Sequence, residues 1–187
     1  MNKVVFLDRD GVINQESLEY IKTRAEFKFI PGSLKAICRL SQAGFNIIII
    51  TNQSVIGRKM VTPEGLLQIH AKLQHQVKKG GGCIKDIFYC PHLPQDQCDC
   101  RKPEPGLIFQ AKKKYNINLS RAIMVGDSAK DIQCAINAGC GATILVQTGN
   151  GKKAIKELAT NDISPDHLAL NLKQAVSWII KYAGKIV

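Results

Sequence analysis

The chain has 187 residues, of which 45% are hydrophobic and 22% are charged, which predicts one domain over residues 1–187 with a substantial apolar core. No apolar run is long enough to cross a membrane, and no signal peptide precedes the first apolar segment, so we expect a cytoplasmic monomer without a membrane partner. The net charge of +11 is spread over predicted helices without interleaved aromatic residues, which favours solvated surface over nucleic-acid binding.

The apolar pattern predicts strands and helices that alternate along the chain. Strands are expected at residues 4–8, 45–51, 84–89, 121–126 and 142–147, with a short edge strand near His167 to Leu170. Helices are expected at residues 32–43, 63–79, 106–116, 129–138, 151–160 and 171–182. This alternation predicts an α/β fold with a doubly wound, mainly parallel sheet. Residues 14–30 are too few for a large cap domain, and residues 80–82, all glycine, predict a flexible loop.

Two acidic residues follow the first predicted strand, in the order Asp8-Arg9-Asp10-Gly11. The carboxyl end of a parallel strand is where open α/β sheets bind their ligands. Two acids buried there need a cation or hydrogen bonds to offset their charge. The pair therefore indicates a metal site, or a nucleophile with its acid/base partner. The alternative is a local turn, capped by Asp8 and with Asp10-Gly11 at its corner.

Three further segments carry polar residues that a parallel sheet would bring to the same edge. Thr51-Asn52-Gln53-Ser54 follows the second strand, Arg101-Lys102-Pro103 precedes a later helix, and Gly126-Asp127-Ser128 follows the strand at 121–126. Together with Asp8 and Asp10 they predict one cleft that holds two groups of acids, a hydroxyl and a pair of cations. Asp131 lies one helical turn beyond Asp127, and it is expected either at this cleft or as a first-turn acid at the helix dipole.

A second cluster contains three of the seven cysteines. Cys90, His92, Cys98 and Cys100 lie within eleven positions, and thiolates with an imidazole suit tetrahedral Zn²⁺. Four protein ligands close the coordination sphere, so the expected zinc is structural and fixes the geometry of the cations that follow it. A disulfide is the alternative, which a cytosolic chain with an odd number of cysteines disfavours. The other cysteines are expected as small core residues: Cys38, Cys83, Cys134 and Cys140.

These motifs resemble the haloacid dehalogenase-like phosphohydrolase superfamily over Val4 to about Thr148. Closer still, the chain resembles the D-glycero-D-manno-heptose 1,7-bisphosphate 7-phosphatase family. The residues that carry this resemblance are Phe6-Leu7-Asp8-Arg9-Asp10-Gly11, Thr51-Asn52-Gln53-Ser54, Cys90-Pro91-His92, Cys98-Asp99-Cys100-Arg101-Lys102-Pro103 and Val125-Gly126-Asp127. The compact loop between His92 and Cys98 also resembles the phosphatase domain of histidinol-phosphate phosphatases.

The resemblance implies Mg²⁺-dependent removal of the 7-phosphate of a heptose 1,7-bisphosphate, a step in lipopolysaccharide-related carbohydrate metabolism. Asp8 would attack phosphorus to form an aspartyl-phosphate, and Asp10 would be the general acid and base. The acid role requires a raised pKa for Asp10. Thr51 and Lys102 would hold the phosphoryl oxygens. Mg²⁺ would be held by Asp8, Asp127 and the backbone carbonyl of Asp10.

Contacts to a sugar bisphosphate are expected from residues of five segments: Arg9, Glu16, Ser17, Tyr20, Asn52, Gln53, Ser54, Arg101 and Ser128. Two alternatives stay open among them. Asn52 and Ser54 are equally compatible with helix capping, and Tyr20 with packing against Phe27 and Phe29.

Three other functions compete with this prediction. Histidinol phosphate and the 3′-phosphate of DNA would be hydrolysed by the same catalytic groups. A receiver-like phospho-acceptor module also gathers acids around Mg²⁺ at strand ends, but the acid/base beside the nucleophile and the Cys-His loop argue against it.

Overall fold

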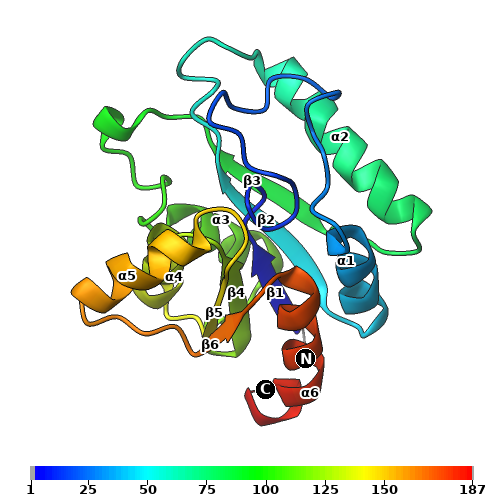
Figure 1. Ribbon diagram of the computed structural model, residues 1–187, viewed down its shortest axis with the longest axis vertical. Coiled ribbons are helices and arrows are strands. Elements are labelled where there is room, and N and C mark those ends of the chain that lie inside the picture. Colours follow the sequence, from blue (N-terminus) through cyan, green and yellow to red (C-terminus); the bar gives the residue numbers. More distant parts are fainter. Residues whose placement is uncertain (1–2, 187) are drawn as a thin grey trace.

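The computed structural model describes residues 3–186, in which six strands form one parallel sheet (Figure 1). The strands are β1 (Val4–Leu7), β2 (Asn46–Asn52), β3 (Asp86–Cys90), β4 (Ala122–Gly126), β5 (Ala142–Val146) and β6 (His167–Ala169). Their order across the sheet is β3-β2-β1-β4-β5-β6. The chain thus winds in one direction from β1 to β3 and in the other from β4 to β6. This order confirms the predicted α/β fold.

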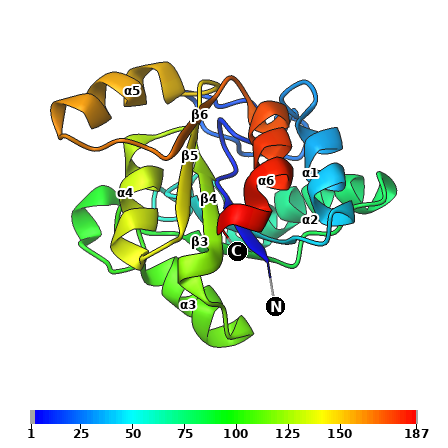
Figure 2. The same cartoon turned by 90° about the horizontal axis from the view of Figure 1, so that it is seen from below.

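Helices cover both faces of the sheet. On one face lie α1 (Ser33–Gln42), α2 (Pro63–Lys79) and α6 (Leu172–Ile186), and on the other lie α3 (Gly106–Tyr115), α4 (Ala129–Ala138) and α5 (Gly151–Thr160), as the view in Figure 2 shows. Among residues 3–186, no separate layer covers the carboxyl ends of the strands, where loops lie (Figure 1). The absence of a large cap agrees with the sequence prediction.

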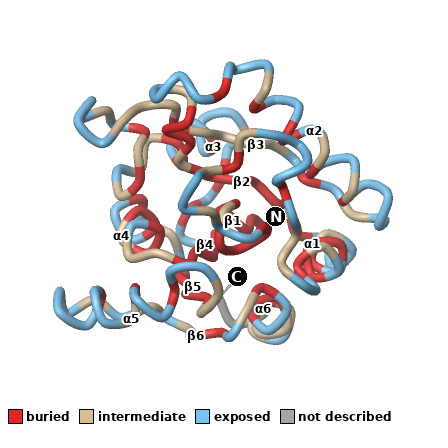
Figure 3. The backbone as a smooth tube through the Cα atoms, turned by 45° about the horizontal axis from the view of Figure 1, so that its top comes forward, coloured by how far each residue is buried: buried red, intermediate tan, exposed pale blue. Residues whose placement is uncertain are grey.

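The central strands are apolar throughout because both of their faces are buried. Val5 and Leu7 of β1 pack toward α1, α2 and α6, whereas Val4 and Phe6 pack toward α3 and α4. Figure 3 shows the buried backbone concentrated in the middle of the sheet, with exposed residues on the outer sides of the helices. The core therefore holds the carboxyl ends of β1, β2 and β4 rigidly side by side.

Three local features differ from the sequence predictions. Two short 3₁₀ helices, Pro94–Asp96 and Leu119–Arg121, were not predicted. Residues 80–82 are not merely a flexible loop, because a Cβ on Gly80 would lie 2.7 Å from the sulfur of Cys38; the glycines let the end of α2 approach α1 closely. Cys83 is exposed rather than a core residue.

Within residues 3–186, no helix combines the length and the apolar character that a membrane crossing needs.

Candidate active site

The site lies where the chain reverses its winding direction, between β1 and β4. The two strands are adjacent and in register, with Leu7 paired to Val125, so Asp8 and Asp127 follow them side by side. The amide of Asp8 also donates to the carbonyl of Val125 at 3.0 Å. Crevices at such reversal points are the usual ligand sites of open α/β sheets.

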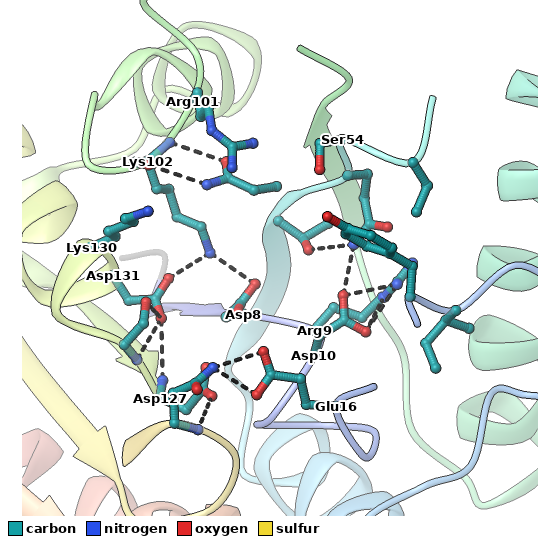
Figure 4. Close-up of a pocket in the computed structure, with 18 of the residues that line it drawn as sticks. Asp8, Arg9, Asp10, Glu16, Ser54, Arg101, Lys102, Asp127, Lys130 and Asp131 are labelled. Carbon is teal, nitrogen blue, oxygen red and sulfur yellow. Dashed lines mark hydrogen bonds and ion pairs between the residues drawn. The ribbon is translucent and has the colours of Figure 1, made fainter. Parts of the chain in front are cut away.

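A pocket of about 370 Å³ opens at this point. All the residues to which the sequence assigned a catalytic or substrate-binding role line it, from five segments of the chain (Figure 4): Asp8, Arg9, Asp10, Glu16, Ser17, Tyr20, Thr51, Asn52, Gln53, Ser54, Arg101, Lys102, Asp127 and Ser128. The structure therefore brings these residues together. It also shows that several of them are engaged with one another rather than directed at open solvent.

Lys102 is a buried cation that lines the pocket. Its ammonium lies 2.8 Å from Oδ1 of Asp8 and 2.5 Å from Oδ1 of Asp131, and it donates to the carbonyl of Ile50 at 2.8 Å. Burial disfavours the ammonium, but the charges of Asp131 and Asp8 outweigh burial and raise the pKa of Lys102. Lys102 therefore stays charged inside the protein, with its ammonium between the carboxylates of Asp8 and Asp131.

Asp131 lies at the cleft and is also a first-turn acid of α4, so both alternatives for it hold. Besides the ion pair with Lys102, its Oδ2 accepts hydrogen bonds from the amides of Ser128 and Asp127 and from the hydroxyl of Ser128, at 3.0, 3.2 and 2.7 Å. These contacts cap the start of α4, since the orphan amides of a first helical turn prefer a carboxylate. The same carboxylate thus orders the loop that carries Asp127 and holds the ammonium of Lys102.

The carboxylates of Asp8, Asp127 and Asp131 form a compact group with ligand atoms within 4.8 Å of one another. Burial raises the pKa of Asp8 to about 7, and Asp131 and Asp10 add to this rise against the opposing charge of Lys102. Burial raises the pKa of Asp127 to about 9, and the charges of Asp131 and Asp8 add to this rise. Like charges held this close in a buried site need a cation, and carboxylate oxygens suit a hard divalent ion. The donor set therefore fits Mg²⁺.

Two glycines make room for the carboxylate of Asp127. A Cβ on Gly11 would lie 2.1 Å from its Oδ2, and so would a Cβ on Gly149. Both glycines also have positive φ, 78° and 56°, which side chains disfavour. The amide of Asn150 donates to the same Oδ2 at 2.8 Å. Asp127 is thus held in one position by loops after β1 and β5.

Asp10 differs from its neighbours because it is paired with a guanidinium. Nη2 of Arg9 donates to both of its oxygens, at 2.9 and 2.8 Å, and the side chains of Asn14 and Gln53 each donate at 2.8 Å. Burial disfavours the carboxylate, but Arg9 and these hydrogen bonds outweigh burial and lower the pKa of Asp10. This direction is opposite to the raised pKa that the acid role of Asp10 requires. Asp10 is therefore a carboxylate at neutral pH.

Thr51, Asn52 and Ser54 lie at the end of β2 or just after it. The side chain of Asn52 makes two hydrogen bonds with the backbone of Lys102, both at 3.1 Å. Its Nδ2 donates to the carbonyl of Lys102, and its Oδ1 accepts from the backbone N–H of Lys102. Asn52 thus fixes the backbone of Lys102. The capping alternative for Asn52 and Ser54 is wrong, because α2 begins later and Thr62 caps it. The hydroxyl of Thr51 is buried and accepts from Gln53 at 2.9 Å.

The mouth of the pocket is formed by the connection after β1. Glu16 accepts two hydrogen bonds from the side chain of Asn150, at 2.7 and 2.6 Å. Tyr20 packs with the cluster of Val55 and Val61, and the guanidinium of Arg58 lies 5.4 Å from its ring centroid. Packing of Tyr20 with Phe27 and Phe29 is therefore wrong, since those two rings contact each other instead.

The Cys-His cluster lies immediately beside the pocket. Cys90, His92, Cys98 and Cys100 place their ligand atoms within 4.8 Å of one another. The sulfur of Cys98 lies 3.6 Å from that of Cys90 and 3.5 Å from that of Cys100. These distances are close to the about 3.8 Å that separates two sulfurs on one tetrahedral zinc with bonds of about 2.3 Å. The cysteines are free, so the disulfide alternative is wrong. The donor set and its spacing fit Zn²⁺.

Sequence reasoning missed several residues of the site. Arg58, Lys130 and Asn150 line the pocket, and His70 contacts Arg9 at 3.2 Å. Lys130 had a signal, because it lies inside the Asp127 to Asp131 motif. The others lie outside every motif, and only the tertiary structure brings them to the site.

Comparison with known proteins places this geometry among phosphatases. Residues 99–175 match the model of a family described as HAD-hydrolase-like. The chain is 44% identical to D-glycero-beta-D-manno-heptose-1,7-bisphosphate 7-phosphatase from Bordetella bronchiseptica, over 83% of this chain and 86% of that protein. It is also 44% identical to the enzyme of that name from Pseudomonas aeruginosa, over 89% and 93% of the two chains.

A solved structure gives the same match in three dimensions. The D,D-heptose 1,7-bisphosphate phosphatase from B. bronchiseptica, complexed with magnesium and phosphate, superposes with a TM-score of 0.89 at 39% identity, covering 96% of this chain and 98% of that one. The resemblance seen in the motifs is thus confirmed over nearly the whole chain. The protein belongs to the D-glycero-D-manno-heptose-1,7-bisphosphate 7-phosphatase family, within the HAD-like hydrolases.

Proposed function

We propose that the protein is a Mg²⁺-dependent phosphatase that removes the 7-phosphate of D-glycero-β-D-manno-heptose 1,7-bisphosphate. The observation that carries this proposal is the pair Asp8 and Asp127 beside a buried ammonium, in a chain whose relatives are named for this reaction. The β anomer is preferred because the relatives from B. bronchiseptica and P. aeruginosa carry that name.

In the proposed first step, a carboxylate oxygen of Asp8 attacks phosphorus and the ester bond to the sugar oxygen breaks. Uncatalysed hydrolysis of phosphate monoesters is among the slowest reactions that enzymes accelerate, so the negative charge on the phosphoryl group must be offset. The buried ammonium of Lys102 supplies a fixed positive charge, and the hydroxyl of Thr51 is a hydrogen-bond donor at the same place. The product of this step is an aspartyl-phosphate.

Asp10 serves both proton transfers of the proposed reaction. It gives a proton to the leaving sugar oxygen and later takes one from the water that attacks the aspartyl-phosphate. Its pKa is low in the structure, so the acid role depends on the dianionic phosphate, whose negative charge raises the pKa of a neighbouring carboxyl. The base role matches the state that the structure describes.

Asp8, Asp127 and the backbone carbonyl of Asp10 would hold Mg²⁺, which neutralises phosphoryl charge when bound. Asp131 is kept from this role by its contacts with Lys102 and α4. Cys90, His92, Cys98 and Cys100 would hold Zn²⁺ and so order the loop that leads into Lys102. The guanidinium of Arg101 donates back to the carbonyl of His92 at 3.2 Å, which ties the loop to the pocket.

The charge around the mouth favours a bisphosphate over the rival substrates. Arg58, Arg101 and Lys130 line the pocket around its rim, opposed there by Glu16, whose carboxylate is bonded to Asn150. Histidinol phosphate carries an ammonium group, which these cations would repel. A steep loss of binding with salt would instead be the mark of a polynucleotide substrate.

A panel of substrates tests the proposal directly. Phosphate release is measured with both anomers of the heptose 1,7-bisphosphate, with histidinol phosphate and with a DNA 3′-phosphate, and phosphorus NMR of the product identifies the carbon that lost its phosphate. The proposal predicts the highest kcat/KM for the β bisphosphate, with the 1-phosphate retained. Equal or better turnover of histidinol phosphate would contradict it.

We also propose that the enzyme works as a monomer in the cytoplasm. The seven cysteines are all free, which agrees with a reducing compartment. Light scattering at several protein concentrations tests the monomer, because a dimer would double the measured mass.

A further inference from the structure

His70 of α2 reaches the catalytic groups through a single contact. Its side chain is 4% exposed, its Nε2 lies 3.2 Å from Nη1 of Arg9, and its ring packs edge-on against Tyr89, with centroids 5.8 Å apart. A buried histidine on a helix is ordinarily a packing residue. The contact with a guanidinium in the pocket wall points to a second role for this one.

Chemistry fixes the direction of that hydrogen bond. A guanidinium carries only donors, so Nε2 of His70 must accept and the imidazole must be neutral with its proton on Nδ1. The electrostatics agree, because burial and then the charge of Arg9 lower the pKa of His70 to about 3, against a smaller opposing effect of Asp10. His70 therefore keeps its acceptor lone pair at any pH near neutrality.

Arg9 connects this acceptor to Asp10. Its side chain is 1% exposed, its Nη2 donates to both oxygens of Asp10, and its Nε lies 3.3 Å from Oδ1. The guanidinium is planar and rigid, so an acceptor on Nη1 fixes the plane in which the other nitrogens present the carboxylate. Without His70, a buried donor would be unsatisfied and would favour a different rotation of the whole group.

We propose that His70 is a positioning residue for the acid/base carboxyl of Asp10 and acts through Arg9. This inference rests on the proposed function, in which Asp10 protonates the leaving oxygen. The proton passes from Asp10 to the sugar oxygen as the ester bond breaks and the bond from phosphorus to Asp8 forms. His70 and Arg9 exchange no proton, so loss of His70 should impair proton delivery more than substrate binding.

The test compares two leaving groups. An alkoxide needs a proton to leave, whereas p-nitrophenolate does not, and kcat/KM covers the phosphoryl transfer to Asp8 in both cases. His70→Phe keeps the ring and removes the acceptor; it should lower kcat/KM for the heptose bisphosphate about tenfold or more and for p-nitrophenyl phosphate less than about threefold. His70→Gln places an amide oxygen near the position of Nε2 and should restore both values to within about threefold of wild type.

Controls separate this role from packing. His75 lies on the same helix and is exposed, so His75→Phe should leave both substrates unaffected. His70→Asn is polar but too short to reach Arg9, and it should reproduce the selective loss if the phenylalanine variant does not fold. In an Asp10→Asn background, His70→Phe should cause no further loss, because both changes remove the same proton transfer.

Two results would overturn the inference: equal losses on the two substrates in both His70→Phe and His70→Asn, or a full further loss in the Asp10→Asn background. Failure of the proposed function has a different signature. Wild-type protein would then reject the heptose bisphosphate, and the comparison of leaving groups would be made with whichever alkyl phosphate the protein hydrolyses.

Discussion

The carboxylate cleft and the Cys-His loop both gather cation ligands, but they do so in opposite ways. The cleft takes Asp8 and Asp127 from the ends of two strands that lie far apart in the sequence, and it is open to solvent through the pocket. The loop takes its four ligands from eleven consecutive positions and closes around them. An open set of hard oxygen ligands suits a metal that works on substrate, and a closed set of thiolates suits one that only holds structure.

The two regions meet at Lys102. Cys100 ends the loop two positions before it, and Asn52 holds its backbone from β2. If the two regions have these separate roles, changes in the cleft should abolish chemistry and spare the fold. Changes in the loop should weaken both.

The largest effect is expected from Asp8→Asn. Removing the nucleophile should lower kcat by at least about 10⁴-fold, while the melting temperature and zinc content stay at wild-type values because an amide fills the same volume. Phosphate release and calorimetry measure the two properties. Asp162→Asn changes an exposed acid outside the pocket and serves as the matched control. Activity within about tenfold of wild type would remove Asp8 from its role.

The next largest effect is expected from the double change Cys98→Ala and Cys100→Ala. Loss of two ligands should release the zinc, lower the melting temperature and depress kcat, since the backbone before Lys102 is then no longer held. Elemental analysis should find one zinc in wild type and none in the variant. Cys83→Ala removes an exposed cysteine outside the cluster and should change neither property. An unchanged zinc content in the double variant would refute the ligand assignment.

Binding of Mg²⁺ should depend on pH in the cleft. In the cation-free protein the pKa values of Asp8 and Asp127 are raised to about 7 and about 9 from an ordinary 3.8. Between these ordinary and raised pKa values, the folded state holds protons that the unfolded state has lost. The stability that the two groups contribute therefore falls as pH rises from about 4 to about 9. Because Mg²⁺ needs the carboxylate form, its affinity should rise at least about tenfold from about pH 6 to about pH 8.

Isothermal titration in buffers of different ionisation enthalpy would measure this affinity and count the protons released. Asp127→Asn removes one of the two carboxylates and should flatten the dependence on pH. An affinity that is constant over this range in wild-type protein would show that the cleft carboxylates are already ionised before the cation binds.

The smallest effect is expected where the two regions are joined. Asn52→Ala removes both hydrogen bonds to the backbone of Lys102, which should cost about 1–3 kcal/mol of unfolding free energy and lower kcat by about tenfold. Zinc should stay bound. Asn52→Asp keeps the acceptor for the amide of Lys102 but loses the donor, so its losses should be intermediate. If the alanine variant has wild-type kcat, the position of Lys102 does not depend on Asn52.

The contrast between the regions also explains what could be predicted from sequence. The Cys-His loop was visible because its ligands lie within one short segment. Asp8, Thr51, Lys102 and Asp127 were visible because each follows an apolar strand or precedes a helix, and parallel strands bring such ends together. The chain order of strands and helices was therefore enough to predict the fold and to bring these residues to one pocket.

Side-chain pairing was not visible in the same way. The lowered pKa of Asp10 follows from the rotation of Arg9 toward it, and Arg9 in turn contacts His70, which is distant in sequence and carries no motif. The role of Asn52 depends likewise on the approach of a loop fifty positions away. Such contacts are set by packing in three dimensions, which a linear pattern does not encode.

The central claim is that phosphorus is bonded to Asp8 for part of each turnover. Rapid quenching in acid after mixing with radiolabelled substrate, followed by digestion and mass spectrometry, tests it most directly. The proposal predicts a phosphoryl group, labile to hydroxylamine, on the peptide that contains Asp8, appearing within the first turnover and missing in Asp8→Asn. Phosphate release at the normal rate without labelled protein at any time, and with inverted configuration at phosphorus, would contradict it.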